Sequence, residues 1–118
     1  MQRDDLVYVG HMLDVARSIG SKLLGRSRVD FDADENLRLA LAHLIQTLGE
    51  AARRVSPIFQ QAHAEIPWKG IIGMRHRIVH DYVHVDFDIV WDVATASVPP
   101  LVPALEKIVP EDDSPETT

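Results

Sequence analysis

Apolar residues recur every three or four positions along most of the chain, the spacing that buries one face of a helix. The first stripe consists of Leu6, Val9, Leu13, Ala16, Ile19 and Leu23. Gly25 is expected to stop this helix. The second stripe consists of Leu37, Leu41, Leu44, Leu48, Ala51 and Val55. It predicts a long core helix, with Asp32 and Glu35 as its N-terminal cap.

Prolines mark the starts of two further helices. Ser56 and Pro57 predict a short helix through Glu65, because a proline at the first helical position loses no hydrogen bond. Pro67 predicts another, which we expect to continue to about Tyr82 despite two internal glycines. Both helices follow the long core helix in the sequence.

The final helix is predicted to start at Asp86, which is expected to cap it. Its inward-facing residues are expected to be Phe87, Val90, Ala94, Ser97, Leu101, Leu105 and Ile108. Three prolines after Val98 predict a kink or break there. Alternation with a period of two is absent over more than four residues, so no strand is predicted. The chain is therefore expected to form an all-α antiparallel bundle of four main helices plus a short one, over residues 1–109.

Composition narrows the class of protein. The chain has 118 residues, 46% of them hydrophobic, which suits one globular domain. It has no cysteine, which excludes disulfides, thiolate metal sites and a cysteine nucleophile. Without a long apolar stretch, and with acids near the start of the chain, we expect a cytoplasmic protein that does not span a membrane.

The net charge of −6 is unevenly distributed. Residues 110–118 carry four carboxylates and no cation, and we predict that they form a disordered acidic tail. The body then has a net charge of only −2. The window from Trp68 to His80 has the opposite sign, with Lys69, Arg75, Arg77, two histidines and no carboxylate. It predicts a local basic patch.

The densest group of chemically versatile side chains is His76, His80 and His84 with Arg75 and Tyr82. If the predicted helix continues this far, the three histidines lie near one stripe of it. One interpretation is structural, because basic side chains are favoured at a helix C-terminus. A second is a metal site, since two histidines four residues apart resemble zinc-binding helices. The neighbouring arginines would repel a metal ion, and no glutamate follows the first histidine.

A third interpretation is a site that cleaves a phosphodiester. The Arg75 guanidinium suits a phosphate and the charge that develops on it. His80 can exchange a proton with a ribose 2′-hydroxyl or the leaving 5′-oxygen. On one ideal helix these two side chains lie about 140° apart, so they do not converge easily. A symmetric dimer with a shared cleft would solve this problem.

The segment from Arg75 to Tyr82 reads RHRIVHDY and resembles the R-x4-H-x-Y motif of HepT-like proteins, a branch of the HEPN superfamily. The resemblance extends through GEAARRVS at residues 49–56, PWKGIIGMRHRIVHDY at residues 67–82 and VDFDIVW at residues 85–91. It covers the chain from about Leu6 to Ile108.

This resemblance implies a homodimeric helical bundle that is the toxin of a prokaryotic toxin–antitoxin pair. Many such proteins are metal-independent endoribonucleases and need no cofactor. Arg75 would bind phosphate, His80 would be the general acid or base, and His76 would support them. The antitoxin would be an MntA-like minimal nucleotidyltransferase that transfers AMP onto Tyr82.

Other residues have more than one interpretation. Glu50 could face the cleft and orient His80 or Arg75, or it could pair with a nearby arginine. Lys69 and Arg77 are candidates for RNA contacts, and Trp68 could stack on a base or pack in the core. The alternative function is a non-catalytic, nucleotide-binding regulatory subunit of a nucleotidyltransferase complex.

Overall fold

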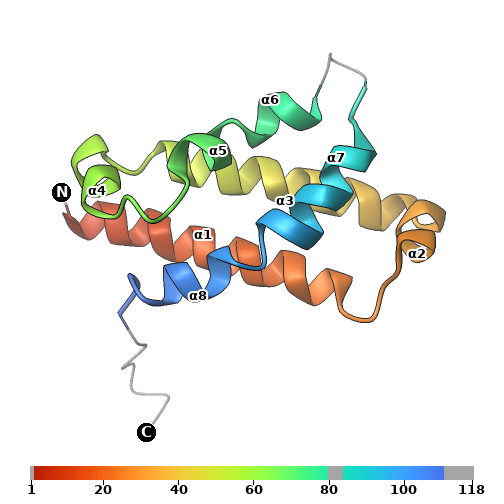
Figure 1. Cartoon of the computed structure of the whole chain (residues 1–118), viewed down its shortest axis with the longest axis horizontal. Coiled ribbons are helices and arrows are strands. Elements are labelled where there is room, and N and C mark those ends of the chain that lie inside the picture. Colours follow the sequence, from red (N-terminus) through yellow and green to blue (C-terminus); the bar gives the residue numbers. More distant parts are fainter. Residues whose placement is uncertain (1, 80–83, 111–118) are drawn as a thin grey trace, which may run out of the picture.

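The computed structural model describes residues 2–79 and 84–110. Its helices are α1 (Gln2–Leu23), α2 (Arg28–Ala33), α3 (Glu35–Arg53), α4 (Pro57–Ala62), α5 (Trp68–Ile72), α6 (Met74–Ile78), α7 (Phe87–Asp92), the π-helical η1 (Val93–Ser97) and α8 (Leu101–Glu106). Four segments alternate in direction: α1, α3, α5 with α6, and α7 through α8 (Figure 1). The short helices α5 and α6 contact α3, and α8 returns to α1. The predicted all-α antiparallel bundle is confirmed.

The two predicted apolar stripes form the contact between α1 and α3, the long helices of the bundle. Val9 and Ile19 of α1 are fully buried, as are Leu41 and Leu48 of α3. Leu44 is only half-buried, although it belongs to the predicted stripe. Burial of apolar surface contributes about 25 cal/mol per Å², so this contact is a main source of stability.

The predicted start of α3 is wrong. Its N-cap is Asp34, whose side chain accepts a hydrogen bond from the Leu37 amide at 3.0 Å. Asp32 instead belongs to a separate helix, α2, which begins with a capping box between Ser27 and Asp30. The sequence pattern missed α2 because a helix of six residues is too short to show a clear apolar period.

Between α3 and α5 the predicted helix start at Ser56 is confirmed. Its side chain accepts a hydrogen bond from the Phe59 amide at 3.3 Å, and Pro57 is the first residue of α4. α4 ends at Ala62, three residues before the predicted end. Trp68 is buried and its indole N–H donates to the His63 carbonyl at 2.9 Å, so the packing interpretation of this tryptophan is confirmed.

The last segment starts and breaks where expected. Asp86 caps α7 by accepting from the Ile89 amide at 3.1 Å. The helix then widens into η1 and stops at Val98, which confirms the predicted break before the prolines. Ser97, predicted to face inward, is exposed. The π-helical turn changes the register by about one residue per turn, so a constant helical period fails here.

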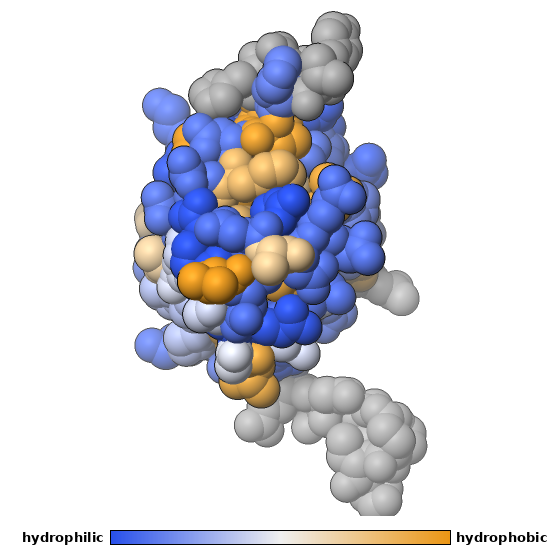
Figure 2. All heavy atoms as spheres, turned by 90° about the vertical axis from the view of Figure 1, so that its right-hand side faces the viewer, coloured by the Kyte–Doolittle hydropathy of each residue, from blue (hydrophilic) through white to orange (hydrophobic). Residues whose placement is uncertain are grey.

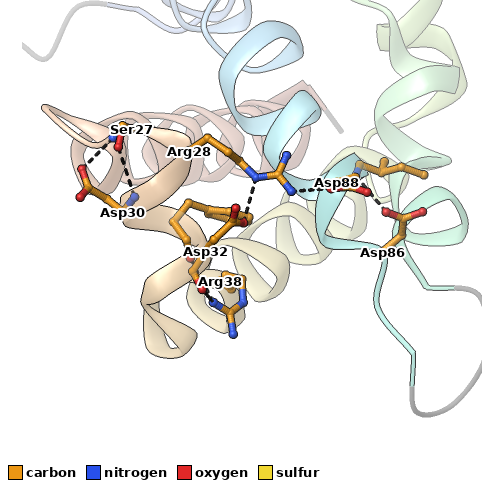
Figure 3. A network of polar contacts seen from close by, with 9 residues as sticks. Ser27, Arg28, Asp30, Asp32, Arg38, Asp86 and Asp88 are labelled. Atoms are coloured by element: carbon orange, nitrogen blue, oxygen red, sulfur yellow. Dashed lines mark hydrogen bonds and ion pairs between the residues drawn. The ribbon is translucent and has the colours of Figure 1, made fainter.

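Arg28 connects α2 to the start of α7 (Figure 3). Its guanidinium donates to Asp32 at 2.9 Å and also to Asp88. It lies 5.6 Å from the centre of the Phe31 ring and 6.0 Å from that of Trp91. Both carboxylates raise the pKa of Arg28, so it stays charged. Figure 2 shows this end of the molecule as mostly hydrophilic, with apolar side chains in a few separate patches.

The acidic tail is predicted over residues 110–118, of which 111–118 lie outside the described residues. Among the described helices, none is both long enough and apolar enough to cross a membrane.

Candidate functional site

A pocket of about 670 Å³ lies between α3 and the α5–α6 pair. Its charged and polar walls include Gln46, Glu50, Arg53, Lys69, Arg75 and His76. Three of these side chains are cations, or four when the histidine is protonated, against one carboxylate. The pocket therefore suits an anionic ligand.

Two glycines shape the floor of this pocket. A Cβ atom on Gly49 would lie 3.0 Å from the Ile71 carbonyl oxygen, so glycine allows α3 and α5 to approach closely. Gly73 separates α5 from α6, and its amide donates to the Lys69 carbonyl at 3.0 Å. This division turns the chain so that Lys69 of α5 and Arg75 of α6 both reach one pocket.

Arg75 is exposed on α6, whereas Met74 and Ile78 of the same helix are buried. The buried pair anchors the short helix on the core and leaves Arg75 and His76 at the pocket. Arg77 is also exposed, but it is not among the described residues that line the pocket. Of the cations in the predicted basic patch, Lys69 and Arg75 thus share a site.

The predicted pairing of Glu50 with a nearby arginine is confirmed, whereas its predicted role in orienting His80 or Arg75 stays a prediction. Its carboxylate accepts a hydrogen bond from the Arg53 guanidinium at 2.9 Å, and it lines the same pocket as Arg75. The pKa of Glu50 is lowered, mainly by the bond from Arg53 and further by the positive charges of Arg54 and Arg75. Glu50 is therefore ionised at neutral pH.

The predicted helix from Pro67 to Tyr82 is wrong. Pro67 is the N-cap of α5 and not its first residue, α5 ends at Ile72, and α6 ends at Ile78. Two glycines weaken the helix, and the β-branched Ile78–Val79 pair favours extended backbone at its end.

After α6 the described residues on either side of positions 80–83 pair with each other. Val79 is extended and makes an isolated antiparallel bridge with Val85, a short strand-like contact that the sequence pattern did not predict. The Asp86 amide donates to the Ile78 carbonyl at 2.7 Å. His76 belongs to α6 and His84 lies beyond its end, so these two histidines do not share a helical stripe, and His80 lies outside the described residues.

His80 and Tyr82, the predicted catalytic and modified residues, fall within residues 80–83, which lie outside the described residues. The predicted approach of Arg75 to His80 is therefore not tested. The metal interpretation also involves His80. Within residues 2–79 and 84–110, no group of three histidine or acidic side chains is placed to hold a metal ion.

A family model described as "Ribonuclease HepT-like" matches residues 12–108, which include this pocket. The chain belongs to the HepT-like family. This membership confirms the resemblance drawn from the motif and supports a ribonuclease of the HEPN type.

Curated relatives of this HepT-like protein have ribonuclease names. "Putative RNase TTE0752" of Caldanaerobacter subterraneus subsp. tengcongensis is 29% identical over 86% of this chain and 91% of its own length. "Probable ribonuclease HepT" of Thermococcus cleftensis is 30% identical over 67% of this chain and 72% of its own length. "Gamma-glutamylcyclotransferase and putative RNase MJ0434" of Methanocaldococcus jannaschii is 28% identical over 96% of this chain, which spans only 51% of that protein. No solved structure matches the chain significantly.

The pocket of this HepT-like protein is also lined by residues outside the motif, which were not singled out from the sequence. Gln46 and Arg53 line the pocket from α3, and Gln60 does so from α4. Gln46, Glu50 and Arg53 follow one another at steps of four and three, so they share a helical face. This polar stripe, opposite the apolar stripe of α3, could have indicated from the sequence that this face of the helix lines a site.

Proposed function

We propose that this HepT-like protein is a metal-independent endoribonuclease and the toxin of a prokaryotic toxin–antitoxin pair. The observation that carries this proposal is the pocket that groups Arg75 with Lys69, Arg53 and His76. Such a set of cations matches the phosphate backbone of RNA. Arg75 also belongs to the family motif, which supports placing the active site at this pocket.

The chemistry uses the nucleophile that RNA itself carries. The 2′-oxygen attacks the adjacent phosphorus, the bond from phosphorus to the 5′-oxygen breaks, and a 2′,3′-cyclic phosphate and a 5′-hydroxyl result. Arg75 stabilises the negative charge on the phosphate oxygens in the transition state. His80 takes the proton from the 2′-hydroxyl or supplies one to the 5′-oxygen, and His76 supports the site.

Two copies of the chain would form the active unit. In this proposal Arg75 and His80 of both copies line one cleft, and the RNA crosses it. A shared cleft gives a two-fold symmetric site from short motifs on each copy. Lys69 and Arg77 would contact RNA beyond the scissile phosphate.

Control would come from the antitoxin, an MntA-like nucleotidyltransferase. The Tyr82 hydroxyl would attack the α-phosphate of ATP, with pyrophosphate as the leaving group. The resulting AMP group adds negative charge and bulk beside His80, where the RNA phosphate must bind. Mass spectrometry of the protein co-expressed with its neighbouring gene product tests this step, and an AMP adduct on Tyr82 is the expected result.

The decisive experiment incubates the purified protein with RNA in EDTA. Cleavage products with cyclic phosphate ends are expected, and His80→Ala should abolish them while the oligomeric state stays unchanged. Cleavage that survives in His80→Ala would overturn the assignment. Intact RNA together with tight mononucleotide binding would support the alternative, a regulatory nucleotide-binding subunit.

A further inference from the structure

The α3 wall of the pocket carries groups that a phosphate does not need. Gln46, Glu50 and Arg53 lie on one face of α3 and line the same pocket as Arg75. A carboxylate repels phosphate, so any contact that Glu50 makes to a ligand here must be with another part of it. The pocket volume, about 670 Å³, lies in the range of small-molecule sites and leaves room for more than a phosphate.

Glu50 and Arg53 present an acceptor beside a donor. Their ion pair joins Glu50 Oε2 to an Arg53 guanidinium nitrogen at 2.9 Å. Their side chains are 42% and 62% exposed, so both can also contact a ligand in the pocket. A carboxylate has two oxygens with about four acceptor positions, and the guanidinium has five N–H donors. The pair therefore forms a compact array of acceptors next to donors.

Two glutamines extend the acceptor side of this array. The Gln60 amide nitrogen donates to the Val55 carbonyl at 2.9 Å, and that of Gln46 donates to the Ala42 carbonyl at 3.4 Å. Each amide nitrogen is thus turned to the protein's own backbone. The amide oxygens are then the groups that these side chains can offer to a ligand.

Among the RNA bases, guanine fits this array best. Its N1–H and N2–H groups are adjacent donors that a single carboxylate can accept together, and its O6 and N7 atoms accept from arginine or lysine. Uracil has one donor between two carbonyl oxygens, which a carboxylate would repel. Adenine and cytosine place one amino group beside a ring nitrogen that only accepts.

We propose that the α3 wall is a guanine subsite, in which Glu50 accepts from the Watson–Crick edge of the base and Arg53 donates to its O6. Glu50 is then a specificity-determining residue for the nucleotide bound next to Arg75. This inference rests on the proposed function only in assuming that the ligand of the pocket is RNA.

Calorimetric titration of the full-length protein with GMP, AMP, CMP and UMP tests the subsite directly. We expect GMP to bind about 10-fold more tightly than UMP, since a bidentate base contact discriminates by this order. Glu50→Gln keeps the side-chain shape but offers guanine one acceptor and one donor in place of two acceptors. It should remove the preference for GMP. Glu35→Gln, at the other end of α3 and outside the pocket, is the matched control and should retain it.

Equal affinity for all four nucleotides would overturn the guanine subsite, as would a GMP preference that persists in Glu50→Gln. This result is independent of catalysis. If GMP is preferred but RNA stays intact, the ribonuclease proposal fails and the subsite stands. If RNA is cut without a preference for guanine and the four nucleotides bind equally, the guanine subsite fails and the ribonuclease proposal stands.

Discussion

Asp5 and Ser56 join the start of α1 to the start of α4. The Asp5 carboxylate accepts hydrogen bonds from both the amide and the hydroxyl of Ser56, each at 2.8 Å. Among the described residues, Asp5 is the one charged side chain that is buried. Asp5 thereby holds Ser56 in position, and Ser56 in turn caps α4.

Asp5→Ala should therefore destabilise the fold. The substitution leaves two half-buried donors of Ser56 without their acceptor, and we expect a loss of about 1–2 kcal/mol in the free energy of unfolding. Urea denaturation followed by circular dichroism measures it. Asp4→Ala removes the exposed neighbouring acid and should cost about 0.5 kcal/mol or less. Equal losses in the two variants would contradict the role of the Asp5–Ser56 contact.

Gly49→Ala should disturb the pocket as well as the fold. The new methyl group would meet the Ile71 carbonyl at 3.0 Å, so α5 must move away from α3. Forced movement of this kind costs about 1–3 kcal/mol. RNA cleavage should fall too, because α5 carries Lys69 and leads into α6.

Gly20→Ala provides the matched control for this substitution. Nothing lies within 4 Å of a Cβ atom at Gly20, which is an exposed helical position. Alanine there should raise the free energy of unfolding by about 0.5–1 kcal/mol. A Gly49→Ala protein as stable and active as the Gly20→Ala protein would show that the close approach is unimportant.

Arg28→Ala should lower the urea midpoint more than Arg17→Ala does. Arg28 bonds to two carboxylates and lies over two aromatic rings, whereas Arg17 forms one exposed ion pair with Glu106 at 2.7 Å. A single exposed ion pair contributes little. Equal midpoints for the two variants would mean that the Arg28 contacts add no more to stability than the single Arg17 ion pair.

Stability should also fall at acidic pH. The pKa values of Asp30 and Asp34 are lowered in the folded protein by hydrogen bonds from backbone amides at helix starts, and that of Glu50 by Arg53. The unfolded chain therefore binds protons more readily than the folded one, so the free energy of unfolding decreases as pH falls. The loss should begin near the ordinary pKa of about 4 and continue below it.

Urea denaturation at a series of pH values between 7 and 2.5 tests this dependence. Asp34→Asn cannot titrate, so its stability should vary less steeply with pH than that of the wild type. An identical slope in the two proteins would contradict the contribution of the Asp34 cap.

The sequence predicted the bundle well where helices are long and their apolar period is regular. The α1 and α3 stripes, the Ser56 and Asp86 caps and the break after Val98 all follow from local rules of burial and backbone geometry. The errors fall on short helices, since α2 and the α5–α6 division depend on tertiary contacts and on glycine. The make-up of the pocket likewise depends on tertiary contacts. Arg75 was predictable from its motif, but its grouping with Arg53 depends on how α3 meets α6.

The close contact at Gly49 also bears on how this site can evolve. Gly49 has no side chain, yet it sets the separation of α3 and α5 at the pocket. Any larger side chain at this position would push the two helices apart without itself contacting a ligand. Substrate range can therefore drift through a backbone position that takes no part in recognition. Surveys that compare only the charged residues of related proteins would miss this source of divergence.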